Sequence, residues 1–180
     1  MMRKKPMLAY PVSDKPIDYD NKISMQPKLD GVRCVIQYDN GEVRAYSRTG
    51  KLWLNIEHIL FNLKPWFALN PHVILDGELY NHDFKDNFEK IISMVRKTKP
   101  TPDARVESAE NVQFHCYDII DEELPFDQRI EFVNESLMLM GDSIHNVLTT
   151  QIPNQFEAEE MHKVNLHSGF EGSILRTNDV

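Results

Sequence analysis

The sequence predicts an α+β fold in which two mainly antiparallel sheets are flanked by helices. Segments rich in apolar and β-branched residues alternate with segments of helical spacing. A tight-turn signal, Asp39-Asn40-Gly41, joins two of the strand-like segments and is typical of a hairpin. Because each sheet and each helix has to bury its apolar face, packed sheets covered by helices satisfy this pattern.

Seven extended segments are expected from period-2 patterning and from short apolar runs between turn residues. They are residues 23–26, 32–38, 42–46, 73–80, 112–120, 147–152 and 172–176. The first two lie on either side of a lysine-containing loop. That loop therefore lies between two sheet strands.

Four helices are expected from apolar residues at helical spacing. They cover residues 55–63, 83–97, 127–140 and 154–166. The first is expected to end before Pro65, and Asn154 suits the N-cap of the last. The second has an apolar stripe that indicates core packing. Residues 99–111 begin Lys-Pro-Thr-Pro and are expected to form a polar loop.

Composition indicates one ordinary folded domain. The chain has 180 residues, 41% hydrophobic content and a mean hydropathy of −0.46, which argues against disorder and against membrane insertion. The basic start has no apolar segment after it, so it is not a secretory signal. Cys34 and Cys116 lie in expected strands and are predicted to be buried free thiols, in keeping with a cytoplasmic protein.

The net charge of −8 opposes nucleic-acid binding, which needs local positive potential. The acidic residues are concentrated in expected helices and loops, where solvated faces are the default interpretation. Arg33, Arg44, Arg48 and Lys51 instead surround the first hairpin. They predict a basic strip there.

The most informative segment is Lys-Leu-Asp-Gly-Val-Arg at residues 28–33. A neutral lysine amine can attack phosphorus, and a neighbouring permanent charge such as Arg33 favours that neutral form. Gly31 permits close approach of the backbone to a ligand. An Asp-Gly turn with exposed basic neighbours is the alternative interpretation.

Two later segments supply acids and an arginine. Leu-Asp-Gly-Glu-Leu-Tyr at 75–80 carries Asp76 and Glu78, and Phe-Glu-Gly-Ser-Ile-Leu-Arg at 170–176 carries Glu171 and Arg176. Carboxylates suit Mg²⁺ and ribose hydroxyl groups, and arginine suits phosphate. These groups are what a lysine that attacks a metal-bound triphosphate needs.

In this order the three segments resemble motifs I, III and IV of the ATP-dependent DNA ligases, which belong to the lysine-dependent nucleotidyltransferases. Ser-Arg-Thr-Gly at 47–50 and Phe-His-Cys-Tyr-Asp-Ile-Ile at 114–120 are similar to further elements of that family. The resemblance implies an adenylation domain of ATP-grasp-like topology with a cleft between its sheets. It also implies ATP and Mg²⁺ as cofactors and nicked double-stranded DNA as the partner.

The resemblance implies roles for single residues. Lys28 would attack the α-phosphorus of ATP to give lysyl-AMP, with Asp30 orienting it or a metal-bound water. Arg33 and Arg48 would hold ribose or phosphate oxygens. Tyr117 would stack on adenine, although a core tyrosine is the competing interpretation.

Four further roles follow from the same resemblance. Glu78 would accept from the ribose or hold metal, and Glu171 would bind Mg²⁺ or its water shell. Gln26 would bond the adenine edge, although the family often has Glu there, which leaves base selectivity open. Arg176 would meet phosphate. Asp76 would face the same side of its strand as Glu78 or support a turn.

The family carries a Lys-x-Lys strand and an oligonucleotide-binding domain beyond the third of these motifs, whereas this sequence has four residues after Arg176. Residues 1–180 are therefore expected to form a single, partial adenylation domain with impaired nick sealing. A monomer in the cytoplasm of a bacterial or phage-infected cell is expected. An RNA ligase, a capping guanylyltransferase and a non-catalytic nucleotide-binding fragment remain as alternatives.

Overall fold

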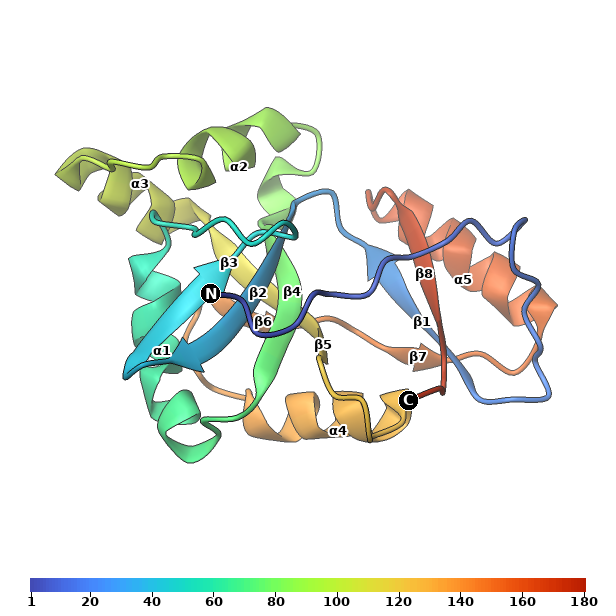
Figure 1. The fold of residues 1–180 in the computed structure, drawn as a ribbon. Helices are drawn as coiled ribbons and strands as arrows, with labels where there is room; N and C mark the ends of the chain where they lie inside the picture. The colour runs from blue at the N-terminus through green and yellow to red at the C-terminus, as the bar shows by residue number, and fades with distance from the viewer.

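The computed structural model describes residues 1–180 and places the strands in two sheets (Figure 1). The larger sheet has the order β3-β2-β4-β5-β6, and the smaller has the order β7-β1-β8. All pairings are antiparallel except that of β5 with β6, which is parallel. The expected α+β class with two mainly antiparallel sheets is confirmed.

Most strand bounds follow the sequence pattern closely, but the strand expected over 147–152 is limited to two residues. The strands are β1 (Ile23–Lys28), β2 (Val32–Asp39), β3 (Glu42–Tyr46), β4 (Ile74–Tyr80), β5 (Gln113–Ile119), β6 (Ile144–Asn146), β7 (Thr150–Gln151) and β8 (Gly172–Thr177). The hairpin turn between β2 and β3 has positive φ at Asn40 and Gly41, as the sequence Asp-Asn-Gly favours. Consecutive strands β1 and β2 belong to different sheets, so the loop between them crosses from one sheet to the other.

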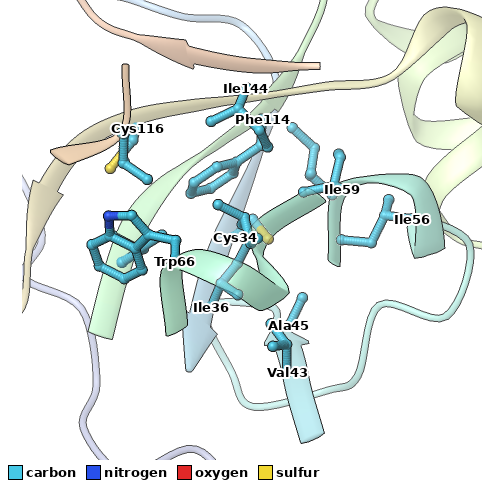
Figure 2. Close-up of a cluster of buried hydrophobic side chains, with 14 of the residues drawn as sticks. Cys34, Ile36, Val43, Ala45, Ile56, Ile59, Trp66, Phe114, Cys116 and Ile144 are labelled. Carbon is cyan, nitrogen blue, oxygen red and sulfur yellow. The ribbon is translucent and has the colours of Figure 1, made fainter. Parts of the chain in front are cut away.

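The helices cover the outer faces of the sheets. They are α1 (Glu57–Leu69), α2 (Phe88–Val95), α3 (Pro102–Asn111), α4 (Phe126–Ser136) and α5 (Gln155–His167), with a short 3-10 turn η1 (His82–Phe84). The main core holds 23 buried residues from the larger sheet and from α1, α2 and α4, including both free cysteines (Figure 2). A second cluster of four residues lies between the smaller sheet and α5. No helix combines the length and the apolar character needed to cross a membrane.

Helix α1 does not end before Pro65 as the sequence suggested. It runs to Leu69 with Pro65 inside. An interior proline costs about 3 kcal/mol because it removes one backbone hydrogen bond and crowds the preceding turn. The next two residues, Trp66 and Phe67, are buried in the core, and burial of two large side chains at about 2 kcal/mol each offsets that cost.

The expected polar loop at 99–111 is wrong for most of its length, because residues 102–111 form α3. Thr101 caps this helix, with its Oγ1 accepting from the backbone N–H of Ala104 at 3.2 Å. Pro102 occupies the first helical turn, where its missing N–H costs nothing. The Thr-Pro pair thus begins a helix here.

Other bounds differ more modestly. The helix expected over 83–97 is divided into η1 and α2, because Asn81 caps the 3-10 turn and a new helix begins after Asn87. Helix α4 ends at Ser136, four residues earlier than expected, and Leu139 then adopts positive φ. Strand β6 was not expected. Asn154 does cap α5, as predicted, by accepting from Glu157 N–H at 2.9 Å.

Candidate active site

Lys28 is the last residue of β1, at the point where the chain leaves the smaller sheet for the larger one. It pairs in register with Gly172 of β8, and its carbonyl oxygen accepts from the Glu171 backbone N–H at 3.2 Å. The Lys28 ammonium lies 2.8 Å from a carboxylate oxygen of Glu171, with the two side chains 45% and 46% exposed. Two segments that are far apart in sequence thus place an amine and a carboxylate at an accessible edge.

Gly31 allows the loop after Lys28 to pack directly on β4. A Cβ atom at this position would collide with the carbonyl oxygen of Leu79 and would lie 2.8 Å from Cγ of Glu78. No side chain fits in that space, so glycine is required for the close approach. The packing brings the lysine loop beside the acidic strand.

Carboxylates outnumber cations next to Lys28. Burial raises the pKa of Asp30, the Glu171 carboxylate raises it further, and Lys28 lowers it. No group of three His, Cys, Asp or Glu side chains forms a ready-made metal cage. Mg²⁺ commonly binds through one or two carboxylates and completes its shell with water and substrate phosphates, so this donor set fits that ion.

Glu78, on β4, is less exposed than Glu171. Its Oε2 accepts from the Tyr117 hydroxyl group at 3.4 Å. Burial raises the pKa of Glu78 to about 8; Arg33 opposes the rise and Asp76 adds to it. A hydroxyl donor or a cation from a ligand would stabilise the ionised form of this carboxyl group, which burial disfavours.

Arg33 is held by Asp76 rather than left free toward the cleft. Its Nε donates to one carboxylate oxygen at 2.7 Å and its Nη2 to the other at 2.5 Å, and Nη2 also donates to the Met7 carbonyl at 3.0 Å. Asp76 is 3% exposed, so this is a buried bidentate pair. Nη1 makes no hydrogen bond within the chain, which leaves one donor group for a ligand.

Tyr117 lies on β5 between two arginines. The guanidinium carbons of Arg33 and Arg176 are each 5.2 Å from its ring centroid, which is a cation–π distance. Arg176 also donates from Nε to Gln26 Oε1 at 3.1 Å and from Nη1 to Asp118 at 3.4 Å. Arg176 of β8 is thus bound to β5 through the Tyr117 ring and the Asp118 carboxylate.

Gln26 is 1% exposed and its amide is engaged by the protein. Nε2 donates to the Tyr117 carbonyl at 3.0 Å and to Thr149 Oγ1 at 3.0 Å. Since Arg176 occupies one acceptor site on Oε1, only a single acceptor lone pair remains for a base edge. Both N–H donors of the amide are used.

The structure does not bring Arg48 to this cluster. It lies exposed in the turn after β3 and makes no hydrogen bond or ion pair within the chain. Arg44, another member of the expected basic strip, pairs with Glu42 at 3.1 Å. Two of the four residues of the expected basic strip, Arg33 and Arg44, are therefore paired with acids, whereas Arg48 and Lys51 make no ion pair within the chain.

Sequence reasoning missed two residues, Asp118 and Arg129, that hold Arg176 in place beside Tyr117. Asp118 is 3% exposed and accepts from both Arg129 and Arg176, with Arg129 Nε at 2.8 Å. Arg129 Nη1 donates to the carbonyl oxygens of Leu124 and Asp179. An acid at a strand end was visible in the sequence, but nothing there indicated its arginine partners.

Known proteins are similar to this chain in sequence and in fold. A family model described as ATP dependent DNA ligase domain matches residues 6–180. DNA ligases of African swine fever virus are similar over 159 residues, at 29% identity for a South African tick isolate and 30% for a Kenyan pig isolate. Each alignment covers 84% of this chain and 36% of the viral protein, so the chain spans about a third of the length of these relatives.

Solved structures share the fold. A Lig E DNA ligase, described as binding DNA with a minimal scaffold, superimposes with a TM-score of 0.75 at 21% identity, covering 99% of this chain and 64% of that one. The bacteriophage T7 ATP-dependent DNA ligase in complex with ATP gives 0.68 at 17% identity, covering 90% and 61%. An archaeal ATP-dependent RNA ligase gives 0.67 at 16% identity, covering 99% and 46%. At these identities the likeness establishes the fold alone. Because the family model spans nearly the whole sequence, this chain belongs to the ATP-dependent DNA ligase domain family.

Proposed function

We propose that this chain adenylates itself on Lys28 as the first step of polynucleotide ligation. The lysine amine attacks the α-phosphorus of ATP, a P–N bond forms, the bond between the α- and β-phosphates breaks, and pyrophosphate leaves. The observation that carries this proposal is the Lys28 amine at an accessible edge between two sheets, beside Glu171, with Asp30 on the same loop. Family membership supports ATP as the donor.

Attack needs a free electron pair on Nζ, so the Lys28–Glu171 ion pair has to open. Glu171 Oε1, at 2.8 Å, is the acceptor within reach of the departing proton. Glu171 and Glu78 are the carboxylates that would hold Mg²⁺ together with phosphate oxygens, and the ion would offset phosphate charge during the transfer. Asp30 would orient the amine from the same loop.

The strand register separates the phosphate end of the site from the base end. Lys28 pairs with Gly172, whereas Arg176 pairs with Ser24, four residues back along β1. At about 3.3 Å per residue this is about 13 Å. We therefore assign Gln26 and Arg176 to the base end, together with Tyr117, which contacts Arg176, and we do not assign Arg176 the phosphate contact expected from the sequence. Glu78 accepts from Tyr117 and would hold Mg²⁺ or accept from the ribose, with the free Nη1 of Arg33 beside it. Arg48 would reach a ligand only through movement of its turn.

The later steps of ligation are the second part of the proposal. AMP would pass from Lys28 to the 5′-phosphate of nicked DNA, and the 3′-hydroxyl would then close the nick with release of AMP. The DNA ligase relatives support nicked DNA as the substrate, and their viral source supports action in an infected cell. The fold is shared with an RNA ligase, so the nucleic-acid preference needs a direct test.

The experiment that tests adenylation uses ATP labelled at its α-phosphate. The chain is incubated with this ATP and Mg²⁺ beside Lys28→Ala and Lys22→Ala. Lys22 is a matched control, since it precedes the same strand and pairs with Asp127 away from the cleft. We expect label on the unsubstituted chain and on Lys22→Ala, and none on Lys28→Ala. Label on Lys28→Ala would refute the assignment.

Two additions to the same assay define the substrates. Replacement of ATP with labelled GTP tests the capping-enzyme alternative, and a GTP adduct in place of the ATP adduct would favour it. A chase with nicked DNA or nicked RNA follows the label from protein to nucleic acid. We expect transfer to the DNA 5′-phosphate, and transfer to RNA alone would favour the RNA ligase alternative.

A further inference from the structure

His82 connects the end of strand β4 to the loop that carries Glu171. It lies in η1, two residues after Tyr80, and its Nε2 is 2.8 Å from the carbonyl oxygen of Ser168, 86 residues further on. Its ring packs against Phe170 with centroids 4.4 Å apart and planes 31° apart. Both partners lie in the turn between α5 and β8, Ser168 three residues and Phe170 one residue before Glu171.

The hydrogen-bond partners of His82 fix the state of its ring. The Ser168 carbonyl can only accept, so Nε2 carries a hydrogen and donates to it. Nδ1 is then the acceptor of the neutral ring, and the Tyr80 hydroxyl group donates to it at 2.5 Å. Tyr80 is itself 2% exposed and packs edge-on against His115. The imidazole is therefore anchored in the larger sheet on one side and bound to the smaller sheet's loop on the other.

A second contact between the same segments lies next to it. Gly169 has a positive φ of 89°, and a Cβ there would lie 2.9 Å from Cε of Lys85, the residue after η1. The aliphatic part of Lys85 thus covers the bare backbone of the turn. Figure 1 shows the β1–β2 connection, the end of β4 and the α5–β8 turn at the same end of the two sheets.

From these contacts we propose that His82 is a positioning residue: it holds the 168–170 turn against the larger sheet so that Glu171 meets Lys28. We call His82, Ser168 and Phe170 the His82 latch. The inference rests on the proposed adenylation and deepens it. Glu171 is bound to the Lys28 region through its backbone N–H and its carboxylate, so a displaced turn moves the proton acceptor away from the attacking amine. Displacement by about 1 Å can slow an enzymatic step by up to about a hundredfold.

Three substitutions separate the two parts of the latch. His82→Ala removes both the ring and the donor. His82→Phe keeps a ring for Phe170 and lacks the donor, and His82→Gln keeps an N–H donor for Ser168 and lacks the ring. The matched control is His72→Ala, because His72 is an exposed histidine that makes no hydrogen bond within the chain. Since His82 is only partly buried, all four variants are expected to fold.

Adduct formation on Lys28 is measured first, as a rate at saturating ATP and as the ATP concentration that gives half that rate. For His82→Ala we expect a rate about tenfold lower, with the half-saturating concentration changed less than about twofold, because the base end of the site is untouched. His82→Phe and His82→Gln should each recover part of the rate. His72→Ala should match the unsubstituted chain. An unchanged rate for His82→Ala overturns the proposal.

Amide hydrogen exchange supplies a readout that needs no activity. In His82→Ala, peptides that cover residues 168–171 should exchange about tenfold faster, while those from α1 should not change. Unchanged protection of this turn overturns the latch even if the rate falls. If the unsubstituted chain forms no adduct while exchange responds as expected, the proposed function fails and the latch contacts stand. The two failures are therefore distinguishable.

Discussion

Replacement of Glu78 with Gln should stabilise the folded chain near neutral pH while it weakens nucleotide chemistry. Burial raises the pKa of Glu78 from 4.5 to about 8, with Arg33 opposing the rise and Asp76 adding to it. The folded chain therefore disfavours the ionised carboxylate. Gln has nearly the same shape without the charge, so Glu78→Gln removes that cost and leaves the packing in place.

The sign and size of this stability gain follow from the linkage between proton binding and folding. The folded state holds the Glu78 proton more tightly than the unfolded state, so this group favours folding below pH 4.5 and loses that contribution as pH rises to about 8. At about 1.4 kcal/mol per pKa unit, the cost of ionisation reaches about 3 kcal/mol at pH 7. Because Glu78 keeps part of its surface exposed, water screens part of this charge, and we expect Glu78→Gln to gain about 2 kcal/mol at pH 7.

Chemical denaturation of both proteins at pH 5, 7 and 8.5 measures the difference. The advantage of Glu78→Gln should be small at pH 5 and should grow with pH until about 8. In the same preparations, adduct formation on Lys28 should fall at least about tenfold, because Gln cannot become the carboxylate that a bound ribose hydroxyl group or Mg²⁺ favours. A variant that is less stable than the unsubstituted chain at pH 8.5 would refute the reasoning about burial.

Gly31→Ala should slow adduct formation, measured with labelled ATP, at least about tenfold, because the added Cβ has to displace Glu78 or the β4 backbone. An unchanged rate would show that the loop can move away from β4. Arg33→Lys should lower the free energy of unfolding by about 2 kcal/mol in denaturation experiments, since a lysine cannot make the bidentate pair with buried Asp76. A loss below about 0.5 kcal/mol would contradict a stabilising role for this pair. Thr101→Ala should lower the free energy of unfolding by about 1 kcal/mol in the same denaturation experiments, because α3 loses its N-cap, and should leave the adduct rate unchanged. Equal stability would argue against the cap.

The strands and the lysine loop could be predicted from the sequence because their determinants are local. Alternating patterns and the Asp-Asn-Gly turn specify β2 and β3. The glycine after Asp30 was expected to let the backbone approach a ligand, whereas in the structure it lets the loop pack on β4. The proximity of Lys28 and Glu171 was implied only through the family resemblance. Local pattern says nothing about which of two strands 144 residues apart will pair, although β1 and β8 do so in full register.

The remaining features depend on tertiary contacts. Helix α1 continues through Pro65 because the residues after it are buried, and propensity alone would end it. Arg33 and Arg176 were expected to face ligands, yet each is first a partner of a buried carboxylate, Asp76 or Asp118. Burial of those acids decides the pairing, and burial is not visible in residue type. For the same reason nothing in the sequence distinguishes His82 from the other histidines.

The most direct measurement is peptide mapping of the chain after incubation with ATP and Mg²⁺, with tandem mass spectrometry to locate any bound AMP. The lysine between two sheets predicts AMP on the peptide that contains Lys28 and on no other. AMP attached to a different residue, or a folded chain that takes up none, would contradict the assignment of Lys28 as the nucleophile.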